Sequence, residues 1–243
     1  KVFPSTTLFR SAFVTFTRPV LGSALPGSSL TNTASLLGYA NAPGGPDHLA
    51  TPLTDDASVT LTAPAVAKTI TATDQAHTTL PAVAVGEIVT YRVVLALPEG
   101  TLPGATVTDT LPAGLALVDC VTVTGSGGVS TSLGGGLAGA CAAGANPAVS
   151  GSTVTFDLGD LTNADRDDAI AENVTLTYRA VVLNTAGNVR GTLLPNSARL
   201  AWTGGSAAPA AAPDVRVVEP ILTVGKVATP ATGDAGDTIE YDV

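Results

Sequence analysis

The sequence is poor in charged and aromatic residues and contains no methionine. Charged residues make up 13% of the chain and aromatic residues 4%, whereas hydrophobic residues make up 45%. This apolar content excludes a disordered chain and is ample for a packed core. The formal net charge of −9 argues against nucleic acid or an anionic membrane as a partner, because both select a basic surface.

Long hydrophobic runs are also missing. No run of about 18 apolar residues occurs, so the sequence predicts no transmembrane helix and no membrane insertion in this segment. No basic segment followed by an apolar one marks a signal peptide. The lack of methionine, and a strand pattern still running at residues 241–243, indicate a piece of a longer protein. Residues 1–11 look like a translated sequencing adapter and are excluded from fold reasoning; a genuine surface segment is the alternative.

The distribution of apolar residues predicts strands and no long helix. Val89, Tyr91, Val93 and Leu95 alternate with the residues between them, and residues 174–180 show the same period of two. Turn sequences rich in glycine and proline separate such runs. The fold class that this pattern predicts is all-β, an immunoglobulin-like antiparallel β-sandwich.

Short motifs recur along the chain in the same order. Asn196 follows Asn32 by 164 residues within similar sequences, and Lys226 follows Lys68 by 158. Such spacing predicts tandem modules of about 150 to 160 residues. The expected division is the end of a preceding repeat at 12–62, a complete module at 63–218 and the first strands of a following repeat at 219–243. The connecting segments 53–64 and 207–213 are expected to be semi-rigid linkers, on which modules either dock or swing.

Three polar residues occupy positions that the alternation assigns to the core: Lys68, Asp109 and Asn196. Burying them unpaired would cost several kcal/mol each. We therefore predict that Lys68 and Asn196 form an intramolecular isopeptide bond and that Asp109 promotes it. Glu172 and Glu87 are alternative promoting acids. The equivalent Asn32 and Lys226 lack partners and should be unreacted.

The motif Thr108-Asp109-Thr110-Leu111-Pro112, together with the lysine strand and the segment 195–198, resembles isopeptide-forming fimbrial and surface repeat domains. It is also similar to the DUF11-type repeats of bacterial envelope proteins. The resemblance covers residues 63–218 and implies an extracellular stalk module of a bacterial cell surface or fimbrium. Its implied partners are neighbouring repeats and other pilus or surface subunits, with adhesion left to a tip.

A plainer interpretation of the same residues stays open. Lys68 can reach solvent at a strand end, Asn196 can cap the turn after Pro195, and Asp109 can hold the following turn through backbone hydrogen bonds. In that case the chain is either a ligand-binding, possibly calcium-dependent, adhesin module or a noncatalytic spacer domain of a secreted enzyme.

The remaining candidates are few. Cys120 and Cys141 are the only cysteines, and in an exported protein such a pair predicts a disulfide; two free thiols are the alternative. Asp165, Asp167 and Asp168 are weak calcium candidates in an acidic turn without EF-hand spacing. No cofactor is expected otherwise. The two histidines lie near no nucleophile or metal-ligand motif, so the chain is not expected to be an enzyme beyond its own cross-linking.

Overall fold

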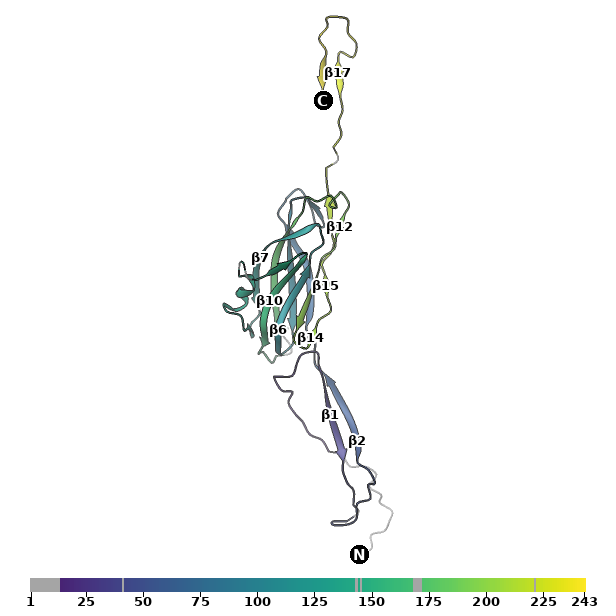
Figure 1. Cartoon of the computed structure of the whole chain (residues 1–243), viewed down its shortest axis with the longest axis vertical. Coiled ribbons are helices and arrows are strands. Elements are labelled where there is room, and N and C mark those ends of the chain that lie inside the picture. The colour runs from purple at the N-terminus through teal and green to yellow at the C-terminus, as the bar shows by residue number, and fades with distance from the viewer. Residues whose placement is uncertain (1–13, 41, 143, 145, 168–171, 221) are drawn as a thin grey trace.

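The computed structural model describes residues 14–40, 42–142, 144, 146–167, 172–220 and 222–243. The segment 1–11 lies outside them. The described part is elongated, with a β-sandwich between two hairpins that project from its opposite ends (Figure 1). The chain is all-β, as the alternation predicts, apart from one short 3-10 helix.

The first sheet of the sandwich has four strands in the order β3-β5-β11-β7, and all of its pairs are antiparallel. The strands are β3 (Ala65–Thr73), β5 (Ile88–Leu97), β11 (Glu172–Val182) and β7 (Leu115–Gly125). Burial alternates along the whole of β11, with every second side chain inside. This period of two places one face of the sheet on the core.

The second sheet follows the order β14-β13-β6-β10-β8, with β15 beside β13 and β9 beside β10. Its long members are β6 (Gly100–Thr110), β10 (Thr153–Asn163) and β13 (Ser197–Trp202). The short ones are β8 (Val129–Thr131), β9 (Ala148–Ser150), β14 (Gly205–Ser206) and β15 (Ala210–Ala211). The sheet is antiparallel throughout.

A small third sheet closes one edge. It consists of β12 (Leu193–Leu194), β16 (Val215–Val218) and β4 (Ala82–Ala84), and β16 pairs with β4 in parallel. This parallel pair departs from the purely antiparallel prediction. β4 precedes β5 whereas β16 follows β15, so the two strands come from opposite ends of the module in the sequence and no hairpin joins them.

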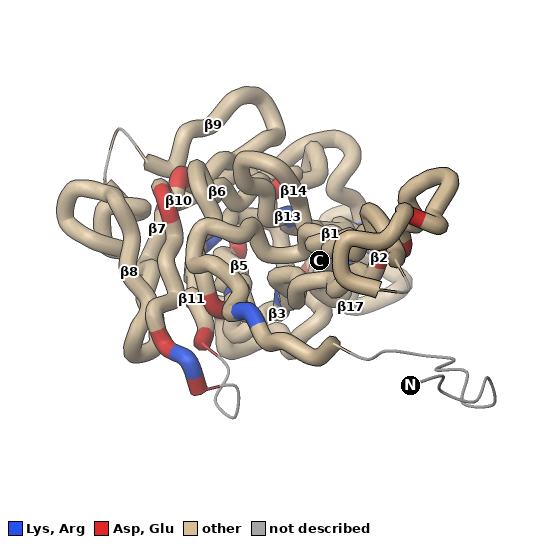
Figure 2. Tube along the Cα trace, turned by 90° about the horizontal axis from the view of Figure 1, so that it is seen from below, with Lys and Arg blue, Asp and Glu red and all other residues tan. Residues whose placement is uncertain are grey.

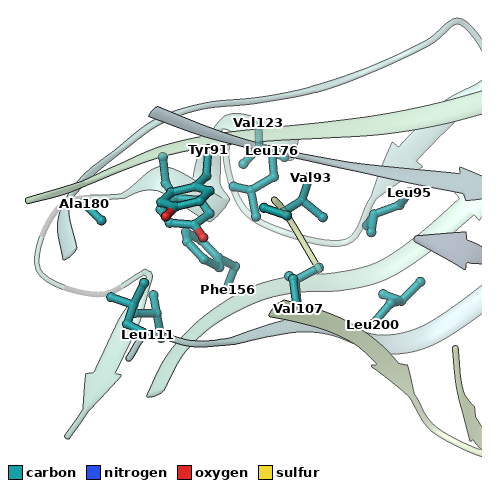
Figure 3. Packing of buried hydrophobic residues seen from close by; sticks show 14 of the residues in the cluster. Tyr91, Val93, Leu95, Val107, Leu111, Val123, Phe156, Leu176, Ala180 and Leu200 are labelled. Carbon is teal, nitrogen blue, oxygen red and sulfur yellow. The ribbon is translucent and has the colours of Figure 1, made fainter. Parts of the chain in front are cut away.

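The hydrophobic core lies entirely within the predicted complete module. Its buried members run from Val83 to Val217, and the partly buried residues packed against them begin at Val66. Tyr91, Phe156 and their aliphatic neighbours fill the space between the sheets (Figure 3). Residues 63–218 therefore bury a core without help from either hairpin.

The second of the two projecting hairpins repeats a pairing found inside the module. The first joins β1 (Ser29–Leu36) to β2 (Leu53–Thr60), and the second joins β17 (Val227–Thr229) to β18 (Glu240–Asp242). Ala228 pairs with Tyr241 in the second hairpin, and Ile70 pairs with Tyr91 in the module. The spacings of the recurring motifs make Ala228 equivalent to Ile70 and Tyr241 equivalent to Tyr91. The second hairpin is thus paired like β3 and β5, and the repeat organisation itself stays a prediction.

Two local expectations are wrong. Residues 53–60, expected within a linker, form β2, and β15 lies within the second expected linker, 207–213. Residues 14–18, Val-Thr-Phe-Thr-Arg, resemble the Val-Thr-Leu-Thr-Tyr-Arg segment 174–179 of β11, but they form no strand. A strand needs hydrogen-bonding neighbours, and β11 finds its own in β5 and β7.

A disulfide and the distribution of charge complete the fold. Cys120 on β7 is bonded to Cys141 at the end of the 3-10 helix η1 (Gly136–Cys141), with Cα atoms 5.3 Å apart. Among the described residues, the Lys and Arg positions are few and lie scattered along the trace (Figure 2). None of the helical structure in the described ranges is long and apolar enough to cross a membrane.

Candidate functional site

Strands from both sheets bring Lys68, Asp109 and Asn196 into the core. Lys68 lies on β3 opposite Val93, Asp109 lies on β6 opposite Ala198, and Asn196 immediately precedes β13. The three residues are 4%, 0% and 2% exposed. The inward orientation that the alternation predicts is thus present in the fold.

A chain of hydrogen bonds connects the three side chains. The Lys68 ammonium forms an ion pair with Asp109 Oδ2, and both side chains are fully buried. The Tyr178 hydroxyl donates to the same Oδ2 atom at 2.5 Å. Asn196 Nδ2 in turn donates to the Tyr178 hydroxyl oxygen at 3.1 Å. Asp109 and Tyr178 together therefore link the lysine of one sheet to the asparagine beside the other.

Aromatic rings enclose this polar chain. The rings of Tyr91 and Tyr178 are stacked, with centroids 5.4 Å apart. Lys68 Nζ lies 5.0 Å from the Tyr91 centroid and 5.6 Å from that of Tyr178. Phe156 packs against Tyr178 from the second sheet, at 5.5 Å between centroids. The rings exclude water and offer their electron-rich faces to the amine.

Three buried polar atoms around the site have no hydrogen-bond partner among the described residues: Tyr91 Oη, Asp109 Oδ1 and Asn196 Oδ1. An unsatisfied buried polar atom costs about 1–3 kcal/mol. Such atoms cluster where a site is built for chemistry as well as for stability. Here two of them are the free oxygens of the acid and of the carboxamide.

Burial shifts the protonation of the pair toward neutrality. Burial lowers the pKa of Lys68 to about 8, against the attraction of Asp109. Burial also raises the pKa of Asp109, an effect that the Lys68 charge and the hydrogen bonds from Lys68 and Tyr178 oppose. The two pKa values therefore lie closer together than they do in water, which lowers the free energy needed to move a proton from the ammonium to the carboxylate.

The alternative acids lie elsewhere. Glu172 accepts a hydrogen bond from Asn163 Nδ2 at 3.2 Å, and that amide also donates to the Leu97 carbonyl oxygen at 3.1 Å. Glu87 accepts from the Thr78 hydroxyl and, at 2.7 Å, from the Ala84 N–H. Asp109 is thus the acid in contact with Lys68.

The two residues that the repeat prediction makes equivalent to Asn196 and Lys68 lie in the two projecting hairpins. Asn32 pairs with Ala57 in the first hairpin. Lys226 Nζ lies 4.5 Å from the ring centroid of Tyr241 in the second, much as Lys68 stands over Tyr91. Both residues are exposed.

The calcium candidates do not form a site in the described part of the chain. Asp165 Oδ1 accepts hydrogen bonds from the N–H groups of Arg166 and Asp167, which is the geometry of a turn. Asp168 lies outside the described residues. Within the described ranges, no three His, Cys, Asp or Glu side chains gather in a way that could hold a metal ion.

Sequence reasoning missed the role of Tyr178. The alternation correctly assigns it to the core, but it gives no reason to expect its hydroxyl between Asp109 and Asn196. The available signal was a tyrosine, instead of a phenylalanine, at an inward position in a chain that already buries an acid and an amide.

Comparisons with known proteins give similarity in structure only. No protein-family model matches the chain, and no curated protein does, so the resemblance to DUF11-type repeats stays a prediction. Among solved structures, the chain is similar to the major pilin SpaD of Corynebacterium diphtheriae, with 15% identity, a TM-score of 0.38, and coverage of 63% of this chain and 34% of the pilin.

Two further solved structures are similar at the same level. The major pilin subunit BcpA of Bacillus cereus has 14% identity and a TM-score of 0.37, covering 74% of this chain and 53% of the pilin. The C-terminal domain of the AgI/II polypeptide BspA of Streptococcus agalactiae has 15% identity and a TM-score of 0.41, covering 67% of this chain and 54% of that one. The chain spans between about a third and about half of the length of these proteins.

Proposed function

We propose that residues 63–218 are a structural shaft module of a bacterial surface protein or fimbrium, stabilised by an isopeptide bond between Lys68 and Asn196. The observation that carries the proposal is the buried hydrogen-bonded chain from Lys68 through Asp109 and Tyr178 to Asn196. A plain hydrophobic sandwich would not keep these groups, because burying them costs free energy that apolar residues would not cost.

The reaction exchanges one amide nitrogen for another. The neutral Nζ of Lys68 attacks Cγ of Asn196, and a tetrahedral intermediate forms with the negative charge on Oδ1. Asp109 accepts a proton from Nζ and gives a proton to Nδ2, which leaves as ammonia when the Cγ–Nδ2 bond breaks. The product is a secondary amide, and the only by-product is one molecule of ammonia.

The environment supplies what this reaction needs. A lysine in water is protonated at neutral pH and is no nucleophile, but burial lowers the pKa of Lys68 to about 8. The raised pKa of Asp109 allows that carboxyl group to hold the transferred proton. Tyr178 fixes both Asp109 and Asn196, so the reacting groups are held in place before the reaction begins.

The bond would redirect mechanical load. The chain enters the sandwich at β3 and leaves it after β16 at the opposite end (Figure 1). With the amide formed, tension passes from residue 68 directly to residue 196, and residues 69–195 lie outside the load path. Closing so long a loop would also stabilise the fold by roughly 5 kcal/mol on the chain-entropy estimate used for disulfides.

The remaining features agree with an exported shaft. A disulfide persists in an oxidising compartment and is rare in the cytosol. Hairpins that match parts of the module project from both of its ends, as in a tandem array (Figure 1). We therefore place the module outside the cell, with neighbouring repeats and other surface subunits as its partners.

The intact mass of the reduced 243-residue chain tests the proposal. We expect the parent to be lighter than its calculated mass by one ammonia, and Lys68→Ala and Asp109→Ala to match calculation. Lys226→Ala is the matched control, because that lysine is exposed and should be unreacted; it should keep the loss of one ammonia. A parent that matches its calculated mass would overturn the cross-link and favour a spacer domain or an adhesin module.

A further inference from the structure

The lower end of the module, where the preceding repeat joins it, is covered by the loop 21–28. A β-carbon built on Gly204 would lie 2.9 Å from Leu25 Cδ1, so Leu25 sits directly on the turn between β13 and β14. On the neighbouring turn, a β-carbon on Gly100 would lie 3.9 Å from Pro26 Cγ. Pro26 is buried and Leu25 half-buried in this contact. The junction is thus a packed surface.

The same loop exists at the upper end of the module, at 185–192. The offset of 164 residues that relates Asn32 to Asn196 relates Leu25 to Val189 and Gly27 to Gly191. Both glycines have positive φ, 79° and 91°. The Gly27 N–H donates to the Thr62 carbonyl oxygen at 3.0 Å, and the Gly191 N–H donates to that of Val217 at 2.8 Å.

Two further backbone hydrogen bonds recur in the two loops at equivalent places. They run from Ala24 N to Leu21 O and from Ser28 N to Leu25 O in the lower loop, and from Asn188 N to Thr185 O and from Thr192 N to Val189 O in the upper one. The two loops therefore share one backbone conformation, and not merely a similar sequence.

The upper loop is rigid but uncovered. Asn188 is buried, and its Nδ2 donates to the carbonyl oxygens of Gly114 and Leu183, each at 2.8 Å. Val189 is nevertheless 54% exposed, and Arg190, at the position of Pro26, is exposed as well. The lower loop, which has the same backbone hydrogen bonds, has its leucine half-buried against the module, whereas the upper loop leaves the equivalent valine open to solvent.

We propose that the loop 185–192 is the docking surface for the following repeat. In this contact Val189 packs on the following repeat as Leu25 packs on Gly204 of the module. The occupant is the lower end of a repeat of the same kind, with the equivalent of the β13–β14 turn on Val189. This inference rests on the repeat organisation within the proposed function. It means that successive modules meet in a fixed orientation and do not swing on their connections.

A two-module chain tests the docking. Val217 takes the place of Thr62, because each accepts the N–H of the loop glycine, so residues 1–217 joined directly to residues 63–243 connect a second complete module as the lower junction connects the first. The second copy buries its own core, because all core residues lie within 66–217. Val189→Cys in the first module and Thr203→Cys in the second should form a disulfide in a thiol redox buffer. Thr203 adjoins Gly204 and lacks its positive φ.

Two controls make the result decisive. Leu25→Cys with Thr203→Cys in the first module reports the lower junction that the structure contains, and it should cross-link. Val121→Cys in the first module, an exposed valine on β7, with Thr203→Cys in the second should not. Nonreducing peptide mapping identifies each bridge. Cross-linking of the Val189 pair at the level of the Leu25 pair supports the docking, and cross-linking at the level of the Val121 pair overturns it.

The intact mass of the same samples distinguishes this failure from failure of the proposed function. Loss of two ammonia molecules without the Val189 bridge would leave the shaft chemistry standing and show that the modules do not dock in this way. The Val189 bridge without ammonia loss would support docking and overturn the isopeptide bond.

Discussion

Asn196 donates a hydrogen bond from Nδ2 to the hydroxyl oxygen of Tyr178, at 3.1 Å. This contact holds the nitrogen that would leave as ammonia, and the same hydroxyl donates to the carboxylate that would protonate that nitrogen. Tyr178 is therefore a positioning residue in the proposed reaction. Its hydroxyl comes from β11 of the first sheet and joins Asp109 on the second sheet to Asn196 beside that sheet.

Tyr178→Phe should slow formation of the cross-link by at least about tenfold, because it removes both hydrogen bonds that orient Asp109 and Asn196. The measurement is the fraction of chain lacking one ammonia, followed by intact mass after refolding from denaturant. Tyr91→Phe is the matched control, since the Tyr91 hydroxyl makes no hydrogen bond within the described residues. Tyr91→Phe should react at the parent rate. Equal slowing of both variants would show that the Tyr178 hydroxyl has no particular positioning role.

The rate of cross-linking should depend on pH as a bell. In its reactive form the Lys68–Asp109 pair holds one titrating proton. That proton is on Asp109, so the amine of Lys68 is neutral. Above the lowered pKa of Lys68, about 8, the pair loses that proton and the acid is missing. Below the raised pKa of Asp109, the pair holds two protons and the amine is charged. A rate that continues to rise well above pH 8 would show that Asp109 is not needed as an acid.

Relative to Lys68→Ala, the uncross-linked fold should become more stable as the pH rises from about 8 toward the ordinary lysine value of 10.5. In this window the unfolded chain binds a proton at Lys68 that the folded chain does not, so the free energy of unfolding increases with pH. Denaturant unfolding of Asn196→Ala across this range measures the trend. Lys68→Ala provides the comparison and should lack this rise.

Replacing Glu172 or Glu87 by glutamine should leave the loss of ammonia intact, since their oxygens bond Asn163 and the turn at Ala84 instead of Lys68. Glu172→Gln retains an oxygen that can accept the Asn163 hydrogen bond, so its effect on stability should stay within about 1 kcal/mol. Intact mass and denaturant unfolding check both points. A variant that folds but keeps its calculated mass would reassign the promoting acid.

Removing the disulfide by Cys120→Ser with Cys141→Ser should lower the free energy of unfolding by about 3 kcal/mol, because the bridge closes a loop between residues 21 apart in sequence. Denaturant unfolding measures this loss. The isopeptide bond should still form, because neither cysteine contacts Lys68, Asp109 or Asn196 through any hydrogen bond of the described residues. Absence of ammonia loss in this variant would show that the two cross-links are coupled.

The sequence alone predicted which polar residues face the core at the site. The period of two predicted that Lys68, Asp109 and Asn196 face inward, and all three are buried. Of the three acids considered as promoters of the cross-link, Asp109 is the one that forms an ion pair with Lys68, and its promoting role stays a prediction. Side-chain direction along a strand is a local property of the backbone, so the sequence alone carries it.

The sequence could not predict which side chains make contact between the two sheets. The stack of Tyr178 on Tyr91, and its hydroxyl between Asp109 and Asn196, depend on the register of β11 against β5 and on how the two sheets pack. The parallel pairing of β16 with β4 and the lack of a strand at 14–18 have the same origin. Each depends on which neighbours the folded chain supplies.

The sequence by itself determined the all-β class, the limits of the core and the identity of the polar residues within it, because alternation and turn chemistry act over a few neighbouring residues. Only the tertiary structure decided which of those residues touch and which surfaces remain uncovered, such as Val189 above the buried Asn188. Those relationships join residues far apart in the chain, and they exist only once the sheets have packed together.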